Sequence, residues 1–185
     1  MEITGYLPPD EFWEMNDRLD QEVRDGAHLL PLFSVTGWDA PIMLGSWQLD
    51  GSEGGVVHGN AFSPTGPQME VITTTQDPHD VARNRWRASA GIPHNLEELQ
   101  RQDATFGAFR SEQVTITVGG RPVQFTLWRG TTSWLAAGTL GGFGIVIDAQ
   151  RNPPSPEAVS LTRVSDVEPL LQARRAALKA LRGEA

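Results

Sequence analysis

The sequence predicts a single α+β domain spanning residues 1–185, with about eight strands in one or two antiparallel β-sheets and helices flanking them. Three observations support this prediction. Residues 113–149 alternate apolar and polar side chains between turns, a pattern typical of an antiparallel meander. Helix-capping signals occur near Asp77 and Ser165. The length also suffices for one core, because a chain of this size buries roughly 70% of its unfolded surface.

The first predicted helix begins at Asp10, a possible N-cap that follows Pro8 and Pro9, and it ends at Gly26. Apolar residues at helical spacing form its inner face: Phe12, Met15, Leu19 and Val23. Acidic residues dominate its outer face: Glu11, Glu14, Asp17, Asp20, Glu22 and Asp25. This outer face is either a charged surface that keeps the helix in water or a surface that recognises a partner.

Short apolar stretches then predict four strands in the first half of the chain. They cover residues 29–35, 42–49, 56–61 and 68–76. Pro31 places the first of them at a sheet edge, because proline lacks the backbone N–H that a central strand needs. Residues 60–67 hold Ser, Pro and Gly and are predicted to form a loop.

Two helices are predicted to follow these strands. Asp77 is the expected N-cap of the first helix, with Pro78 in its first turn, and this helix runs towards Ala90. Asn95 begins a shorter helix that ends at Gln102.

The meander and a final helix complete the predicted elements. Gly119 and Gly120 turn the first hairpin, strands 134–139 and 143–149 follow, and residues 158–164 form a last strand. Ser165 and Glu168 match a capping box for the final helix. An apolar stripe marks its inner face: Val167, Leu170, Leu171, Leu178 and Leu181. Basic residues occupy its second half, where they favour the helix dipole: Arg174, Arg175, Lys179 and Arg182.

A Ser-Trp pair followed by glycines begins at Ser46 and recurs 87 positions later at Ser133. This recurrence suggests a duplication of two β-β-β-α halves, residues 29–102 and 113–182. The alternative is that hairpins resemble one another in a glycine-rich chain.

The charge is unevenly distributed along the chain. The net charge is −8, and residues 1–54 hold 11 acidic and 2 basic side chains, against 12 and 13 in residues 55–185. Phosphate groups and anionic lipids require a basic surface, so nucleic acid and membranes are disfavoured as partners, and another protein with a basic surface is favoured. The absence of Cys excludes disulfides and, with no predicted apolar span, places the protein in the cytoplasm.

No residue pattern identifies a catalytic group, a metal site or a cofactor site. The four histidines lack the spacing of metal ligands. Asp77, His79 and Asp80 form the densest group of possible ligands, but their place at a helix start is explained as well by capping and by the helix dipole.

The preferred functional prediction is a non-catalytic protein-interaction module, such as an immunity-type inhibitor of a basic toxin or a secretion-chaperone-like adaptor. A homodimer is a further prediction. The expected partner-binding residues are Glu11, Glu14, Asp17, Asp20 and Trp128. Trp128 points away from Phe125 and Leu127 on its strand, so it is either covered by a second layer or an interface anchor.

The alternative prediction is a small-molecule-binding domain or hydrolase with a pocket beside the predicted 60–67 loop. Its candidate residues are His58, Asn60, Asp77, His79, Asp80, Arg83 and Arg87. Arg83 and Arg87 share a helix face and either hold a phosphate or carboxylate or pair with acids of the first helix.

Overall fold

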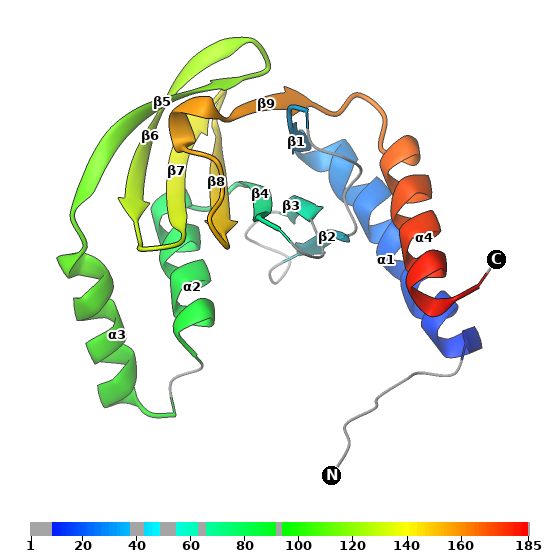
Figure 1. Cartoon of the computed structure of the whole chain (residues 1–185), viewed down its shortest axis with the longest axis horizontal. Helices are drawn as coiled ribbons and strands as arrows, with labels where there is room; N and C mark the ends of the chain where they lie inside the picture. The colour runs from blue at the N-terminus through cyan, green and yellow to red at the C-terminus, as the bar shows by residue number, and fades with distance from the viewer. Residues whose placement is uncertain (1–8, 38–42, 49–54, 63–65, 92–93, 185) are drawn as a thin grey trace.

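The computed structural model describes residues 9–37, 43–48, 55–62, 66–91 and 94–184, with the backbone alone at 43–48 and 55–62 and at Pro9 and Ala88. It confirms an α+β fold, in which two helix pairs lie on either side of a curled sheet (Figure 1). The helices are α1 (Pro9–Leu29), α2 (Pro78–Ala90), α3 (Leu96–Ala108) and α4 (Glu168–Arg182). The strands are β1 (Phe33–Val35), β2 (Met43–Gln48), β3 (Gly55–Phe62), β4 (Gln68–Thr74), β5 (Ser111–Val118), β6 (Arg121–Arg129), β7 (Trp134–Leu140), β8 (Phe143–Gln150) and β9 (Ser160–Arg163). A short 3-10 helix, Pro156–Ala158, precedes β9.

Within the described residues, nine strands form one sheet in the order β1-β9-β5-β6-β7-β8-β4-β3-β2. Its neighbours are antiparallel except β5 and β9, which run parallel. The prediction of an antiparallel sheet is therefore correct for the meander and wrong at β9. The chain leaves β8 and crosses to the far side of β5 before it forms β9, and this crossover sets the parallel direction.

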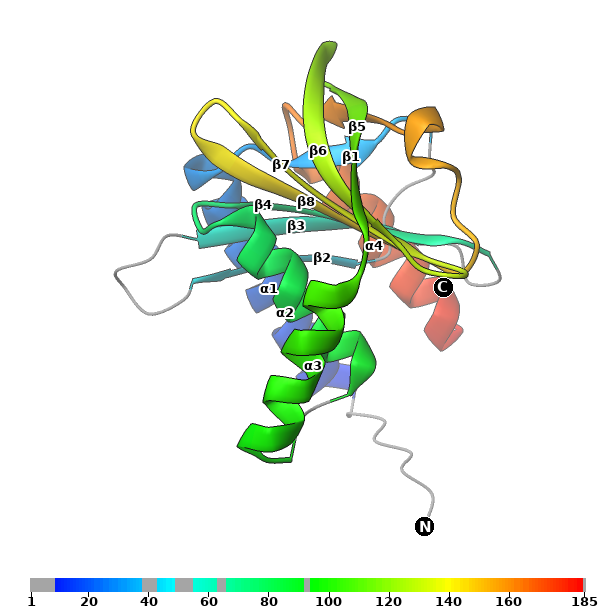
Figure 2. The same ribbon diagram turned by 90° about the vertical axis from the view of Figure 1, so that its left-hand side faces the viewer.

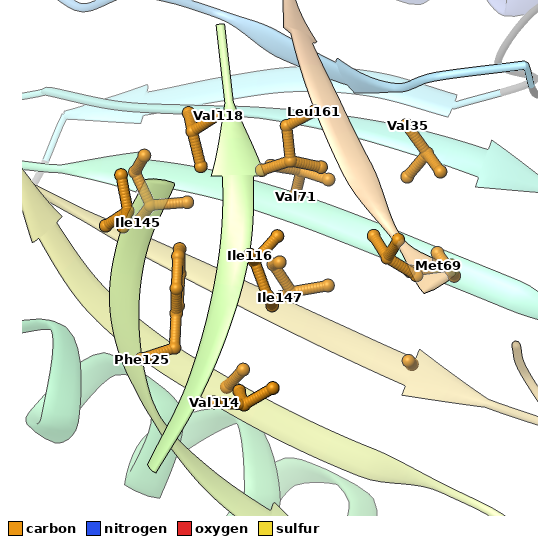
Figure 3. Packing of buried hydrophobic residues seen from close by; sticks show 14 of the residues in the cluster. Val35, Met69, Val71, Val114, Ile116, Val118, Phe125, Ile145, Ile147 and Leu161 are labelled. Carbon is orange, nitrogen blue, oxygen red and sulfur yellow. The ribbon is translucent and has the colours of Figure 1, made fainter. Parts of the chain in front are cut away.

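The sheet curls until its edge strand β1 approaches β3 and β4, which gives it a nearly barrel-like shape (Figure 2). Apolar side chains from both sides of the curl meet inside it (Figure 3). They include Val35, Met69, Val71, Val114, Ile116, Val118, Phe125, Ile145, Ile147 and Leu161. The alternation in the meander sends every second residue into this interior. The main core thus lies inside the curled sheet.

The helices cover the outside of the sheet in two pairs. α2 packs on β7 and β8, and Val81 and Ala82 bury a second cluster against Ile72, Ala137 and Val146. α1 and α4 lie side by side on the other flank (Figure 1), where a third cluster contains Val23, Leu30, Leu32 and Leu171. Both faces of the central strands are therefore covered.

Several helix ends differ from the prediction. α1 continues through the buried Gly26 to Leu29, and the Leu30 backbone N–H still donates to the Gly26 carbonyl at 3.0 Å. Asp10 lies within its first turn. α3 continues to Ala108 because Phe106 packs against the aromatic side chains of its neighbours. At α4, Asp166 accepts the Glu168 backbone N–H at 3.0 Å, so the predicted capping box is wrong.

The strand order differs between the two proposed duplicated halves. In the first, β2, β3 and β4 are consecutive neighbours; in the second, β7 and β8 are neighbours but β9 pairs with β1 and β5. Duplication stays a prediction, without a shared strand order to support it.

Candidate functional site

An open cleft of about 320 Å³ lies between the α2–α3 helix pair and the outer face of β6, β7 and β8. We call it the aromatic cleft. Figure 2 shows the two helices in front of these strands. Its lining comprises Trp86, Ser89, Phe106, Phe109, Trp128, Arg129, Gly130, Thr132, Ser133, Trp134, Leu135, Asp148, Gln150 and Arg151. Its volume is at the lower end of the range for small-molecule sites, which is about 300–1,000 Å³.

Four rings from three elements form a continuous wall of this cleft. Trp86 of α2 packs against Phe106 of α3 and against Phe109, the residue that follows α3, with ring centroids 5.6 and 5.7 Å apart. Phe106 also reaches Trp128 of β6 at 5.2 Å. Phe106 is buried, whereas Phe109 is 39% exposed at the rim. The wall is therefore anchored inside and open to solvent at one edge.

Polar contacts hold α3 beside α2. Asn95 caps α3 by accepting the Glu98 backbone N–H at 2.8 Å, as predicted. The Gln102 side-chain amide donates to the Gly91 carbonyl at 2.9 Å. Arg87 of α2 forms a salt bridge with Asp103 of α3. These contacts fix the position of Phe106 over Trp128.

The floor of the cleft is a row of residues that pair across the strands. Trp128, Leu135 and Asp148 are successive cross-strand partners from β6 to β8, and Glu70 of β4, outside the lining, pairs with Asp148 on its other side. The Asp148 side chain lines the cleft although the residue is only 6% exposed. The Gln150 amide donates to both Asp148 carboxylate oxygens, at 3.1 and 3.3 Å. A buried carboxylate therefore forms part of the floor, next to the apolar side chain of Leu135 and the Trp128 ring.

Arg85 of α2 lies over the two neighbouring carboxylates, Glu70 and Asp148. Its terminal Nη2 forms a salt bridge with Glu70, and its Nε lies 3.5 Å from Asp148. This Nε is buried without a hydrogen-bond partner among the described atoms. The Arg85 guanidinium is therefore directed mainly at Glu70, outside the cleft lining.

The turn between β6 and β7 forms the rim. Arg129 binds the carboxylates of Glu112 and Glu157, the latter at 2.7 Å. The hydrogen bond to Glu112 is the main cause that raises the pKa of Arg129 above its ordinary value. The Gly130 N–H donates to the Ser133 carbonyl at 2.8 Å and closes the turn.

Five of the residues predicted to form a pocket, Asp77, His79, Asp80, Arg83 and Arg87, lie on α2 or at its N-cap and are not part of the cleft lining. Asp77 caps α2 as predicted, and the hydrogen bond from the His79 backbone N–H lowers the pKa of the Asp77 carboxyl. The His79 ring contacts Trp128 edge-on at 5.7 Å. Asp80 pairs with Arg83 at 3.2 Å. The pocket lies instead at the C-terminal half of α2, because Trp86 and Ser89 face the gap beneath α3.

Two further parts of that prediction concern β3 and the arginines of α2. Asn60 belongs to strand β3, so the predicted loop start at residue 60 is wrong. The side chains of His58 and Asn60 lie outside the described residues. Arg83 and Arg87 pair within the α2–α3 helices, so their predicted pairing with acids of the first helix is also wrong.

The acidic face of α1 is partly occupied by α4. Asp20 is buried and accepts from Arg174 at 2.8 Å, while Asn16 accepts from the same guanidinium at 2.5 Å. Asp17 binds Arg175 at 2.6 Å on the exposed side. Burial raises the pKa of Asp20 and lowers that of Arg174. The predicted exposure of Asp20 is therefore wrong, whereas Glu11 and Glu14 are exposed.

Trp128 is half-buried beneath α3 and His79. A second layer therefore covers part of Trp128, and its role as a partner-binding residue stays a prediction. The sequence reasoning missed Phe106, Asp148 and Arg85. Two acids inside mainly apolar predicted strands, Glu70 and Asp148, could have indicated a functional site on the sheet.

Comparison with protein-family models, curated proteins and solved structures finds no match for this chain. No helix in the described ranges is long and apolar enough to cross a membrane. Within the same ranges, no three His, Asp or Glu side chains form a group that could hold a metal ion.

Proposed function

We propose that this chain is a cytoplasmic ligand-binding domain that takes a small organic molecule into the aromatic cleft. The observation that carries the proposal is the cleft itself, with four aromatic side chains on its wall and one buried carboxylate in its floor. Concave, mainly apolar sites with a few placed polar groups are typical of small-molecule binding.

The lining favours binding over catalysis. Its hydroxyl groups belong to Ser89, Thr132 and Ser133; the lining contains no histidine or lysine, and its one carboxylate, Asp148, accepts from the Gln150 amide. A nucleophilic hydroxyl requires an adjacent general base. The proposed role of the lining residues is therefore to hold and orient a ligand.

The earlier protein-interaction hypothesis remains a second proposal with less support. Asp20 is buried, and Asp17, although exposed, makes an ion pair with α4. Glu11 and Glu14 are the two other exposed acids of that set. Two exposed acids provide a small electrostatic surface for a basic partner, whether a toxin, a secreted protein or another copy of the chain.

The test is ligand-detected saturation-transfer NMR with small aromatic and alkyl compounds that include cationic, neutral and anionic members. Ser89 is an exposed cleft residue, so Ser89→Trp should fill the cleft mouth without disturbing the core. Gln100→Trp, at an exposed α3 position outside the lining, is the matched control.

We expect hits to bind the wild type and Gln100→Trp equally, and Ser89→Trp at least about tenfold more weakly. Equal binding to Ser89→Trp, or no hits with the wild type, would overturn the proposal.

A further inference from the structure

We infer that the ligand of the aromatic cleft carries a compact organic cation of the alkylammonium class, held between the Asp148 carboxylate and the aromatic wall. This inference rests on the proposed function and adds the chemical class of the ligand. Its basis is the combination of a buried acid with exposed ring surface in one cleft.

The carboxylate of Asp148 is placed to receive a cation. The residue lines the cleft and is 6% exposed, and its carboxylate accepts hydrogen bonds from the neutral side-chain amide of Gln150. Arg85 pairs mainly with Glu70 and approaches Asp148 most closely through Nε, at 3.5 Å, and this Nε makes no hydrogen bond among the described atoms. A buried carboxylate interacts strongly with a charged donor because little water screens it.

The aromatic wall suits the other side of such a ligand. The negative faces of Trp and Phe rings attract cations, and aromatic enclosures recognise quaternary ammonium groups in this way. Trp86 and Trp128 are half-buried in the wall, and Phe109 is 39% exposed at its edge. An alkylammonium group also buries its methyl groups against these rings, unlike a strongly hydrated metal cation.

The basic residues at the rim do not reverse this preference. Arg129 is engaged by two carboxylates, Glu112 and Glu157. Arg151 is exposed, so water and salt screen its charge. An anionic ligand, in contrast, would have to lie beside the buried Asp148 carboxylate.

The test compares three probes of nearly equal shape on the full chain at constant ionic strength. Choline carries the cation. In dimethylbutanol a carbon replaces the ammonium nitrogen, and dimethylbutanoate carries the opposite charge. Affinities are measured by tryptophan fluorescence and NMR titration. We expect choline to bind at least about tenfold more tightly than either of the others.

Asp148→Asn keeps the shape and removes the charge, so choline should lose at least about tenfold in affinity while dimethylbutanol is unchanged. Glu97→Gln, which also removes one carboxylate charge but at an exposed α3 position outside the lining, is the matched control and should leave both affinities unchanged. If Asp148→Asn does not fold, Phe109→Ala at the exposed rim should weaken choline binding by about two- to fivefold.

The outcomes separate the two proposals. If the neutral or anionic probe binds as tightly as choline or more tightly, and Ser89→Trp weakens that binding, the inference of a cationic ligand is overturned while the cleft is supported as a binding site. Failure of choline to bind would also overturn the inference of a cationic ligand. The separate NMR screen then decides whether the cleft binds small molecules at all. Choline binding that survives both Asp148→Asn and Phe109→Ala would place it elsewhere and overturn the inference.

Discussion

The two helix pairs, α1 with α4 and α2 with α3, are each held together by different side-chain contacts. At the α1–α4 contact a buried guanidinium, Arg174, bridges Asp20 and Asn16, and exposed pairs such as Arg24 with Glu168 lie around it. At the α2–α3 contact the rings of Trp86 and Phe106 meet, and the Arg87–Asp103 salt bridge is only partly buried. The charged contact lies beside the buried apolar cluster of Val23, Leu30, Leu32 and Leu171, whereas the aromatic one borders the cleft beside β6–β8.

This difference suggests a division of roles. Flexible arginine side chains can reach their acids across an uneven surface and fill it. Flat rings that contact one another edge-on or at a tilt leave gaps that their shapes cannot fill. We therefore expect the α1–α4 pair to contribute mainly stability, and the α2–α3 pair to combine stability with the binding site.

The largest expected effect is on the charged pair. Asp20→Ala leaves the buried Arg174 without its carboxylate and should lower the free energy of unfolding by about 3–5 kcal/mol, measured by urea denaturation. Asp17→Ala is the matched control, since Asp17 makes an exposed ion pair with Arg175; it should cost less than about 1 kcal/mol. Similar losses in the two variants would show that the Asp20 pair is not effectively buried.

An intermediate effect is expected on the aromatic pair. Phe106→Leu keeps an apolar side chain but removes two ring contacts, with Trp86 and Trp128, and should cost about 1–3 kcal/mol in free energy of unfolding. Phe109→Leu, at the exposed rim, should cost less than about 1 kcal/mol. An equal cost for both would contradict the view that Phe106 anchors the wall.

The smallest expected effect is at the start of α2. Asp77→Ala removes the N-cap and should cost about 1 kcal/mol at neutral pH. The pKa of Asp77 is lowered in the folded state, so its contribution is present above its unfolded pKa and is lost as pH falls below about 4. Urea denaturation of both proteins between pH 7 and 3 should show their stabilities converging. A constant difference would exclude the carboxylate as the source.

The local patterns in the sequence predicted most of the elements. Alternation in residues 113–149 gave the meander, and the Asp77 and Asn95 caps gave the starts of α2 and α3. These features depend on neighbours within a few residues. The end of α3 was predicted too early because Phe106 is held by rings of α2 and β6 rather than by its own turn.

By itself the sequence determined the α+β class, the meander and the separation of acidic α1 from basic α4, since these follow from periodicity and composition. Only the tertiary structure decided that Arg174, rather than Arg83 or Arg87, pairs with an acid of α1. It also placed Asp148 beneath the rings of α2 and α3. Many arginines and acids are chemically interchangeable in one sequence, and the path of the chain selects which of them meet.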